Sequence, residues 1–357
     1  MRAVTLDSAG LARIPGMPAL PGFRPQPTHH CVTGSMLHVF SHAGIDVSED
    51  MLLGLGAGAG FFYWHMRGAP PMLLGRGNVH RPKTDGLEID TSRRLGVVAE
   101  RFVTGSAKKA RASLDAELDA GRPVMMNVDM GYLPYFDFPD DYHFGGHVIA
   151  VAGRDGDTYL VADRDGALHP VPRADLEAAR GSKHKPFPPR HMWYRFDAAG
   201  AHAPTAVDLW SAIAQNADAM LHGPISNIGV RGIRKAAGLI PKWSGQLDDA
   251  ALRDACLNNF IFIDATGGTG GGLFRLMYAR FLREAEAITG ASELAAVADQ
   301  FDAAGQRWDA AAQVFKAVYE GAPPSELGTL KPALLAIADI EQSAWARLEE
   351  AATAAAG

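Results

Sequence analysis

The amino-acid sequence predicts an α+β protein in which a helical and antiparallel β-sheet region comes first and a mostly α-helical region follows. Up to about residue 197, segments with helical apolar spacing are followed by short apolar runs that are bounded by turn residues and typical of strands. From Pro204 onward, helical periodicity continues almost throughout in Ala-rich segments. We therefore expect two domains, over residues 1–200 and 201–357.

The first strong helical pattern starts at Cys31. Apolar residues recur through Met36 and Phe40, and Gly44 follows where a left-handed cap fits. Asp and Gly in the segment 154–157 predict a tight turn between two strands. Similar signals predict the remaining elements of the first domain, which are helices over 48–54 and 106–120 and strands over 123–128, 147–153, 158–162 and 192–196. In the second domain they predict helices over 205–222, 248–263, 273–289, 292–320 and 331–355.

Composition narrows the classes of function. The chain has 357 residues, of which 47% are hydrophobic, enough for well-filled cores. A net charge of −6 and the absence of a long basic run disfavour nucleic-acid binding. The sequence contains neither a long uninterrupted apolar run nor a signal-peptide pattern, so we expect a cytoplasmic protein that does not associate with membranes.

Only two cysteines occur, Cys31 and Cys256, so any cysteine chemistry uses a single thiol. Cys256 lies within an apolar helical pattern that is typical of a buried core residue. Cys31 is expected at a helix N-terminus, where unpaired amides and the helix dipole favour a thiolate and can stabilise an oxyanion. We interpret Cys31 as a nucleophile.

A base and an acid are predicted from the sheet. His147 opens a strand directly after Gly145 and Gly146, and Asp163 ends the strand that the 154–157 turn brings back beside it. Asp165 and Asp155 are alternative acids. A cysteine on a helix, a histidine on a strand and an acid sixteen residues later follow the order of papain-like enzymes.

Other polar residues near these positions are candidate parts of the site. Gln26 could donate to an oxyanion, and His30, Tyr142 and His143 could line the substrate site. His38 and His42 share a helix face at a spacing known from zinc sites, but no carboxylate completes the motif, so we expect no metal.

A glycine-rich segment, residues 266–272, precedes a helix in the second domain. Its glycine spacing and lack of lysine exclude a Walker loop. Its amides could bind an anion near Arg275, although a flexible turn is an equally good interpretation. The preceding segment carries basic residues that could dock an acidic protein, namely Arg231, Arg234, Lys235 and Lys242.

Three segments of the first domain, residues 28–35, 145–153 and 159–163, resemble the butirosin-biosynthesis acyltransferase BtrH family. The resemblance continues at 267–275, with Tyr278 and Phe281, into the helical domain that commonly follows. It implies a papain-like cysteine-peptidase-type domain and the catalytic residues Cys31, His147 and Asp163. The glutamine of papain-like enzymes usually lies six residues before the cysteine, whereas Gln26 lies five before Cys31.

The resemblance implies acyl transfer from the phosphopantetheine thioester of an acyl carrier protein to a small amine, with no other cofactor. The candidate substrate-binding residues of the second domain are then Gly268, Gly270, Gly271, Arg275 and Tyr278. A cysteine peptidase or amidase that uses the same three residues is the alternative, and a catalytically inert binding module is a third. Homo-oligomer formation is left open.

Overall fold

Segments that are far apart in the sequence build each of the two units of this protein. The computed structural model describes residues 5–6, 12–13, 18–66, 69–79, 85–139 and 141–356. The first unit comprises Met1–Glu49 and Leu95–Ala203, and the second comprises Asp50–Arg94 and Pro204–Gly357. The chain therefore crosses between the units three times.

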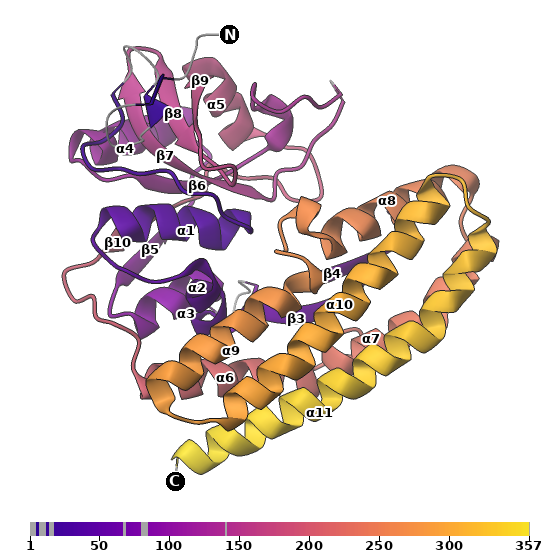
Figure 1. The fold of residues 1–357 in the computed structure, drawn as a ribbon. Helices are drawn as coiled ribbons and strands as arrows, with labels where there is room; N and C mark the ends of the chain where they lie inside the picture. The colour runs from indigo at the N-terminus through magenta and orange to yellow at the C-terminus, as the bar shows by residue number, and fades with distance from the viewer. Residues whose placement is uncertain are drawn as a thin grey trace. The chain divides into compact units, whose positions relative to one another are not determined.

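The first unit combines helices with an antiparallel sheet (Figure 1). In chain order its elements are β1 (Thr5–Leu6), β2 (Ala12–Arg13), α1 (Cys31–His42), β5 (Val98–Phe102), α4 (Ala107–Asp119), β6 (Val124–Val128), the 3₁₀ turn η1 (Met130–Tyr132), β7 (His147–Asp155), β8 (Thr158–Ala162), β9 (Leu168–Pro172), α5 (Arg173–Gly181) and β10 (Trp193–Asp197).

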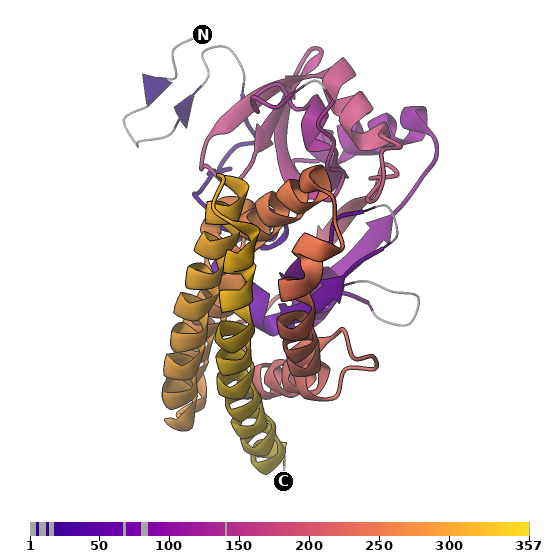
Figure 2. The same ribbon diagram turned by 90° about the vertical axis from the view of Figure 1, so that its right-hand side faces the viewer.

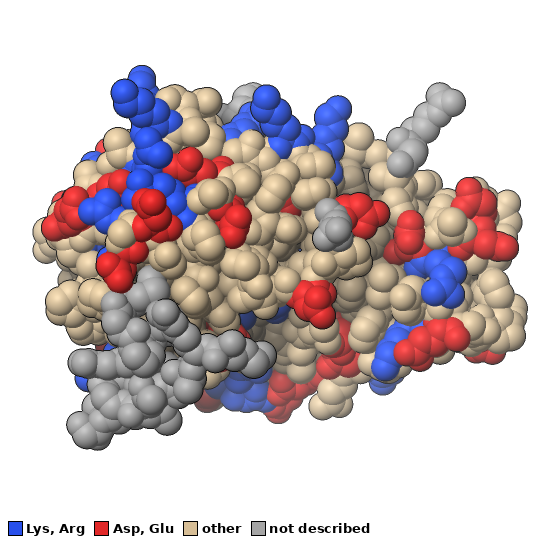
Figure 3. Space-filling view, turned by 90° about the horizontal axis from the view of Figure 1, so that it is seen from above, with Lys and Arg blue, Asp and Glu red and all other residues tan. Residues whose placement is uncertain are grey.

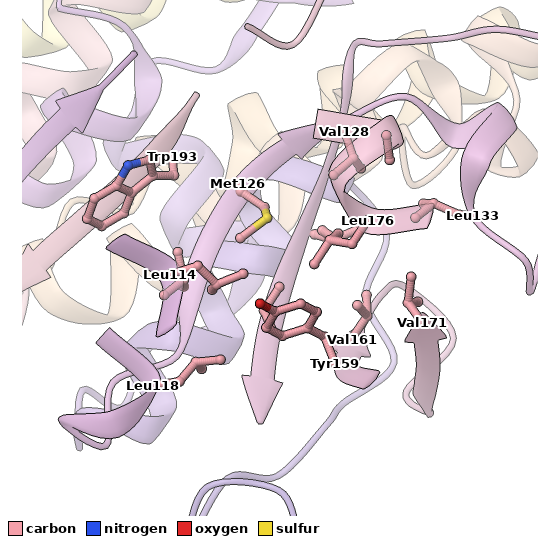
Figure 4. Close-up of a cluster of buried hydrophobic side chains, with 14 residues drawn as sticks. Leu114, Leu118, Met126, Val128, Leu133, Tyr159, Val161, Val171, Leu176 and Trp193 are labelled. Atoms are coloured by element: carbon pink, nitrogen blue, oxygen red, sulfur yellow. The ribbon is translucent and has the colours of Figure 1, made fainter. Parts of the chain in front are cut away.

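A six-stranded antiparallel sheet in the order β5-β10-β6-β7-β8-β9 organises this unit. Figure 4 shows the apolar cluster on one face, where side chains from the sheet meet Leu114 of α4 and Leu176 of α5. Ile149 and Val151 of β7 also belong to this cluster. Since side chains alternate along a strand, Val148 and Ala150 point to the opposite face.

Helix α1 packs on that opposite face, against β6 and β7 (Figure 1). The small Ala150 and Ala152 are fully buried there, so the helix can approach the sheet closely. Burial of Met36 and Phe40 on α1 contributes roughly 1.5–3 kcal/mol for each side chain. The apolar pattern in the sequence correctly predicted this helix.

The β7-β8 hairpin matches the sequence prediction. Asp155 pairs with Thr158 across a two-residue turn, and Gly156 adopts a φ of +54°, which glycine tolerates without strain. The ladder has an irregularity between Val151 and Gly153. The hairpin brings residue 163, just beyond β8, back towards residue 147, where β7 begins.

The second unit is mostly helical and contains one hairpin. Figure 2 shows its long helices α10 and α11 side by side. Its elements are α2 (Glu49–Leu55), β3 (Ala59–Trp64), β4 (Met72–Arg76), α3 (Leu87–Arg94), α6 (Ala206–Leu221), α7 (Gly229–Leu239), η2 (Ile240–Gly245), α8 (Asp249–Ile263), η3 (Ala265–Gly267), η4 (Gly272–Phe274), α9 (Arg275–Thr289), α10 (Glu293–Tyr319), η5 (Pro324–Thr329) and α11 (Leu330–Ala356).

The expected domain limits differ from these units in the segment Asp50–Arg94. We expected this segment within residues 1–200, but it packs with the C-terminal helices. Buried amides explain the difference: Asn216 of α6 bonds both backbone groups of Ala59, and Asn259 of α8 accepts from the amide of Leu73 at 2.7 Å. The two-stranded β3-β4 sheet thus obtains its missing backbone partners from helices that lie much later in the chain.

The α+β class and the helical character of the C-terminal region are confirmed. The prediction missed β3, β4, α3 and β5, and also β9, α5 and α7. None of the helices in the described residues has both the length and the apolar character that a membrane span requires.

An ion pair lies at the centre of the second unit. Arg275 and Glu341 are fully buried and share two hydrogen bonds of 2.9 and 2.8 Å. Trp308 also donates to Glu341, at 2.9 Å, and Arg275 donates to the carbonyl of Gly60 at 2.6 Å. The pair therefore joins β3 to helices α9, α10 and α11.

We expect Glu341→Gln to lower the free energy of unfolding by about 3 kcal/mol, because it leaves the Arg275 charge buried without a counter-ion. The matched control is Glu349→Gln on the same helix, whose exposed pair with His222 should contribute less than about 1 kcal/mol. Urea unfolding followed by circular dichroism measures both variants. Equal losses would contradict the central role of the buried pair.

Candidate active site

Cys31 is the first residue of α1 and is half-buried. The preceding residue, His30, is the N-cap in extended conformation and makes no side-chain capping hydrogen bond. Because the first amides of a helix have no partners within the helix, this end carries partial positive charge and favours a thiolate. The predicted placement of Cys31 at a helix N-terminus is confirmed.

A buried carboxylate, Glu49, holds the backbone that leads into α1. It accepts hydrogen bonds from the amides of His29 at 2.7 Å and His30 at 2.8 Å, and from the hydroxyl of Thr33 at 2.9 Å. Burial raises the pKa of Glu49, and these hydrogen bonds oppose the rise. Sequence reasoning missed this role, because only the tertiary fold brings residue 49 next to residue 30.

The lead-in to α1 is also attached to the loop after β8. The amide of Thr28 donates to the carbonyl of Arg164 at 2.8 Å, and Pro27 and Asp165 form an isolated β-bridge. These contacts fix the start of α1 relative to residue 163. Shared backbone contacts therefore position Cys31, the predicted nucleophile, and Asp163, the predicted acid.

His147 and Asp163 form a buried pair in which Nε2 of the imidazole and Oδ2 of the carboxylate are 2.7 Å apart. Both side chains are at most 5% exposed. Cys31 forms a hydrogen bond with the same imidazole. The structure thus brings together the three residues that the sequence singled out.

The contact between His147 and Asp163 shifts the pKa values of both side chains. Burial disfavours the imidazolium, but Asp163 and then Cys31 outweigh it and raise the pKa of His147 to about 10. Burial likewise opposes ionisation of Asp163, yet His147, Tyr135 and the Arg164 amide together lower the pKa of Asp163 to about 2. At neutral pH the two residues form an imidazolium-carboxylate ion pair.

Tyr135 is a third partner of Asp163 that sequence reasoning missed. Its hydroxyl donates to Oδ2 at 2.8 Å, and the Arg164 amide donates to Oδ1 at 2.8 Å. Burial and the neighbouring Asp163 raise the pKa of Tyr135 well above its ordinary value. The only sequence signal was the density of aromatic residues between 132 and 144.

The alternative acids lie elsewhere. Asp165 bonds the exposed side of His169, with Nε2 to Oδ2 at 2.9 Å. Asp155 is exposed at the end of β7. In the part of the chain that the structure describes, Asp163 is the one of these three acids that forms a hydrogen bond with His147.

Gln26 does not lie at Cys31. Its side-chain amide donates to the hydroxyl of Ser41 at 3.1 Å, in the last turn of α1. Ser41 is ten residues after Cys31, so at a rise of about 1.5 Å per residue the Gln26 side chain lies roughly 15 Å along the helix from the thiol. The oxyanion role expected of Gln26 does not fit this position.

The other candidate residues of the first unit occupy different surroundings. His30 is buried next to Cys31 in the chain. His143 bonds the buried Asp129 at 3.1 Å and stacks on His184 with ring centroids 3.4 Å apart. Tyr142 is 38% exposed.

The two histidines with zinc-like spacing bond to the backbone. Nε2 of His38 lies 3.1 Å from the amide and carbonyl of Gln26, and Nε2 of His42 lies 3.0 Å from the carbonyl of Gly121. In the described part of the chain, no group of three or more His, Cys, Asp or Glu side chains could hold a metal ion.

The glycine-rich loop of the second unit binds a carboxylate of the same unit, that of Asp309. The amide of Gly272 donates to Oδ1 of Asp309 at 2.6 Å. Gly268, Gly270 and Gly271 adopt φ values of +87°, +67° and +84°, so glycine is needed for the backbone path. Arg275 and Tyr278 are fully buried in the core of the unit, and Arg275 pairs with Glu341.

The predicted basic cluster lies mainly on α7. Arg231, Arg234 and Lys235 share one face of this helix, and each has a partner within the unit: the carbonyl of Gly223, Asp339 and Asn227 respectively. Lys242 is exposed on η2. On the molecular face in Figure 3, basic and acidic side chains are intermixed and neither sign covers a large area.

Two family models match this chain in succession. Residues 30–164 match "Butirosin biosynthesis protein H, N-terminal", and residues 174–348 match "Domain of unknown function (DUF4872)". No curated protein matches the sequence. The first model covers Cys31, His147 and Asp163. Residues 30–164 of the chain are therefore similar to the N-terminal region of butirosin biosynthesis protein H.

Proposed function

We propose that this protein is a biosynthetic acyltransferase that forms an amide through an acyl-Cys31 intermediate. The observation that carries the proposal is the arrangement of the buried His147: Asp163 holds Nε2 at 2.7 Å, and Cys31 bonds the same ring. Because Nε2 bonds Asp163, Nδ1 is the ring nitrogen left for the hydrogen bond with the Cys31 sulfur. This arrangement suits a thiolate-imidazolium nucleophile.

In the first half-reaction, the Cys31 sulfur attacks the carbonyl carbon of a thioester donor. The S–C bond to Cys31 forms, the bond between the acyl carbon and the donor sulfur breaks, and the donor thiolate takes the proton from His147. The amides at the N-terminus of α1 supply positive potential for the oxyanion. Acyl-Cys31 and neutral His147 remain.

In the second half-reaction, an amine attacks the acyl-Cys31 carbonyl. Neutral His147 accepts the amine proton, the bond from the acyl carbon to Cys31 breaks, and the sulfur leaves as a thiolate. The amide is released and the thiolate-imidazolium pair is restored. Asp163 keeps the imidazole in one orientation throughout and stabilises its charged form.

The proposed donor is the phosphopantetheine thioester of an acyl carrier protein, and the proposed acceptor is a small amine. The similarity of residues 30–164 to the N-terminal region of butirosin biosynthesis protein H supports this choice. Carrier proteins are acidic, so the basic face of α7 formed by Arg231, Arg234 and Lys235 is the proposed docking surface. No residue of the glycine-rich loop is needed in this proposal.

Intact-mass spectrometry tests the covalent step. After incubation with acyl-N-acetylcysteamine or carrier-bound thioesters, the protein should gain one acyl group, and added amine should remove it as an amide. Cys31→Ala should show no adduct. The matched control is Cys256→Ala, which should behave as the unmodified protein, since Cys256 is fully buried and burial raises its pKa to about 11.

An adduct that decays at one rate with and without amine would assign hydrolysis instead of transfer. Acylation at a residue other than Cys31 would contradict the proposal.

A pH series tests the ion pair. His147 is protonated up to about pH 10, so its charge should keep Cys31 ionised well below the ordinary thiol pKa of about 8.5. In a Cys256→Ala background, we expect iodoacetamide to alkylate Cys31 at a nearly constant rate from about pH 5.5 to 8. With His147→Ala, the rate should fall about tenfold per pH unit below about pH 8. Identical profiles would remove His147 from the mechanism.

The two neighbouring acids provide a matched pair for the third test. Asp163→Asn should lower kcat/KM by roughly 100-fold or more, because the imidazole loses its orienting charge. Asp165→Asn should change kcat/KM by no more than about twofold, since Asp165 is 56% exposed and its carboxylate bonds the side chain of His169 instead of His147. The amide product is quantified with a short thioester donor. A larger effect at Asp165 would reverse the assignment.

A further inference from the structure

The loop between β6 and β7 is anchored at its base. Asp129 is fully buried, and its Oδ1 accepts from the amides of Gly131 at 3.1 Å and Phe144 at 3.0 Å. Its Oδ2 accepts from the hydroxyl of Ser182 at 2.6 Å. The amide of Met130 also donates to the carbonyl of Phe144 at 3.0 Å. One carboxylate therefore ties together both ends of the loop.

This loop carries a row of aromatic rings that begins at the imidazole of His147. Phe136 meets that imidazole edge-on, with ring centroids 5.9 Å apart and planes at 76°. Phe138 stacks on Phe136 at 5.1 Å, and Tyr142 stacks on Phe138 at 4.3 Å. Both stacked pairs have interplanar angles of 29°. The row is continuous from the proposed base to its outer end.

The outer rings are exposed although they are large and apolar. Phe138 is 37% exposed and Tyr142 is 38% exposed. Neither belongs to the apolar cluster under the sheet, whereas Phe136 packs against it. Core packing therefore accounts for the inner ring but not for the outer two. Ordered aromatic faces next to a reacting centre favour a flat apolar group.

We propose that Phe136, Phe138 and Tyr142 bind the acyl group of the donor, and that this group is aromatic. The inference rests on the proposed function, since it assigns the acyl pocket of the same site. With the acyl carbonyl at Cys31, an aryl ring attached through a short linker packs against the exposed parts of Phe138 and Tyr142 and excludes water from them. A short aliphatic or charged acyl group gains nothing from these faces.

The test compares phenylacetyl- and acetyl-N-acetylcysteamine as donors. We expect a kcat/KM for the phenylacetyl donor at least about tenfold higher, and a fall of about tenfold in this ratio with Phe138→Ala. Phe138→Leu keeps an apolar side chain but loses the aromatic ring. Its ratio of phenylacetyl to acetyl kcat/KM should therefore lie between the ratios of the unmodified protein and Phe138→Ala. Val98→Ala is the control, because Val98 is 63% exposed on β5, at the far edge of the sheet from β8 and β9.

A second arm is independent of turnover. Isothermal titration calorimetry measures binding of the same two thioesters to Cys31→Ala, which cannot be acylated at that position. Preferential phenylacetyl binding that disappears in Cys31→Ala/Phe138→Ala supports the aromatic site even if no transfer is detected. Equal binding of both thioesters, or equal effects of Phe138→Ala and Val98→Ala, overturns it. Phenylacetyl selectivity without any Cys31 adduct would instead disprove only the proposed transfer.

Discussion

The buried carboxylate of Asp163 is the group on which the arrangement of the site depends. A charge that leaves water must be paired and hydrogen-bonded, so the surrounding chain has to supply donors. It does so from three places: His147 at the start of β7, Tyr135 in the loop that precedes β7 and the backbone of Arg164. The three donors come from different segments of the chain. The Asp163 carboxylate therefore fixes the positions of these segments relative to one another.

The same pairing sets the chemistry. An imidazole that stays protonated to about pH 10 is a poor general base by itself, but it is a good counter-ion for a thiolate. In the proposed mechanism, acylation of Cys31 removes the thiolate, which is one of the charges that hold the proton on His147. His147 is then easier to deprotonate when the donor thiol leaves. The imidazole can then act as a base towards an amine. The proposed order of the two half-reactions is thus consistent with the electrostatics of Cys31, His147 and Asp163.

Local signals in the sequence were sufficient for the parts of the site that are built locally. The helix at Cys31 and the β7-β8 hairpin follow from periodicity and turn residues, and the hairpin brings residues 147 and 163 into contact. The positions of Gln26 and Glu49 depend on tertiary contacts with Ser41 and His30, which no short-range pattern encodes. The glycine-rich loop was ambiguous for a related reason: the anion that its amide binds is Asp309, from a helix later in the chain. The β3-β4 hairpin was missed because the side chains that complete its hydrogen bonds come from α6 and α8.

The interleaved path of the chain has a consequence for its biosynthesis. Residues 50–94 leave the ribosome early, but Asn216 and Asn259, which bond β3 and β4, are translated much later. At roughly 5–20 residues per second, this hairpin waits on the order of ten seconds for its partners. All residues of the first unit have been translated by residue 203, before Asn216 and Asn259. Nascent chains therefore pass through a stage in which the β3-β4 hairpin lacks the side chains that complete its hydrogen bonds, and this stage is where chaperones would be expected to bind.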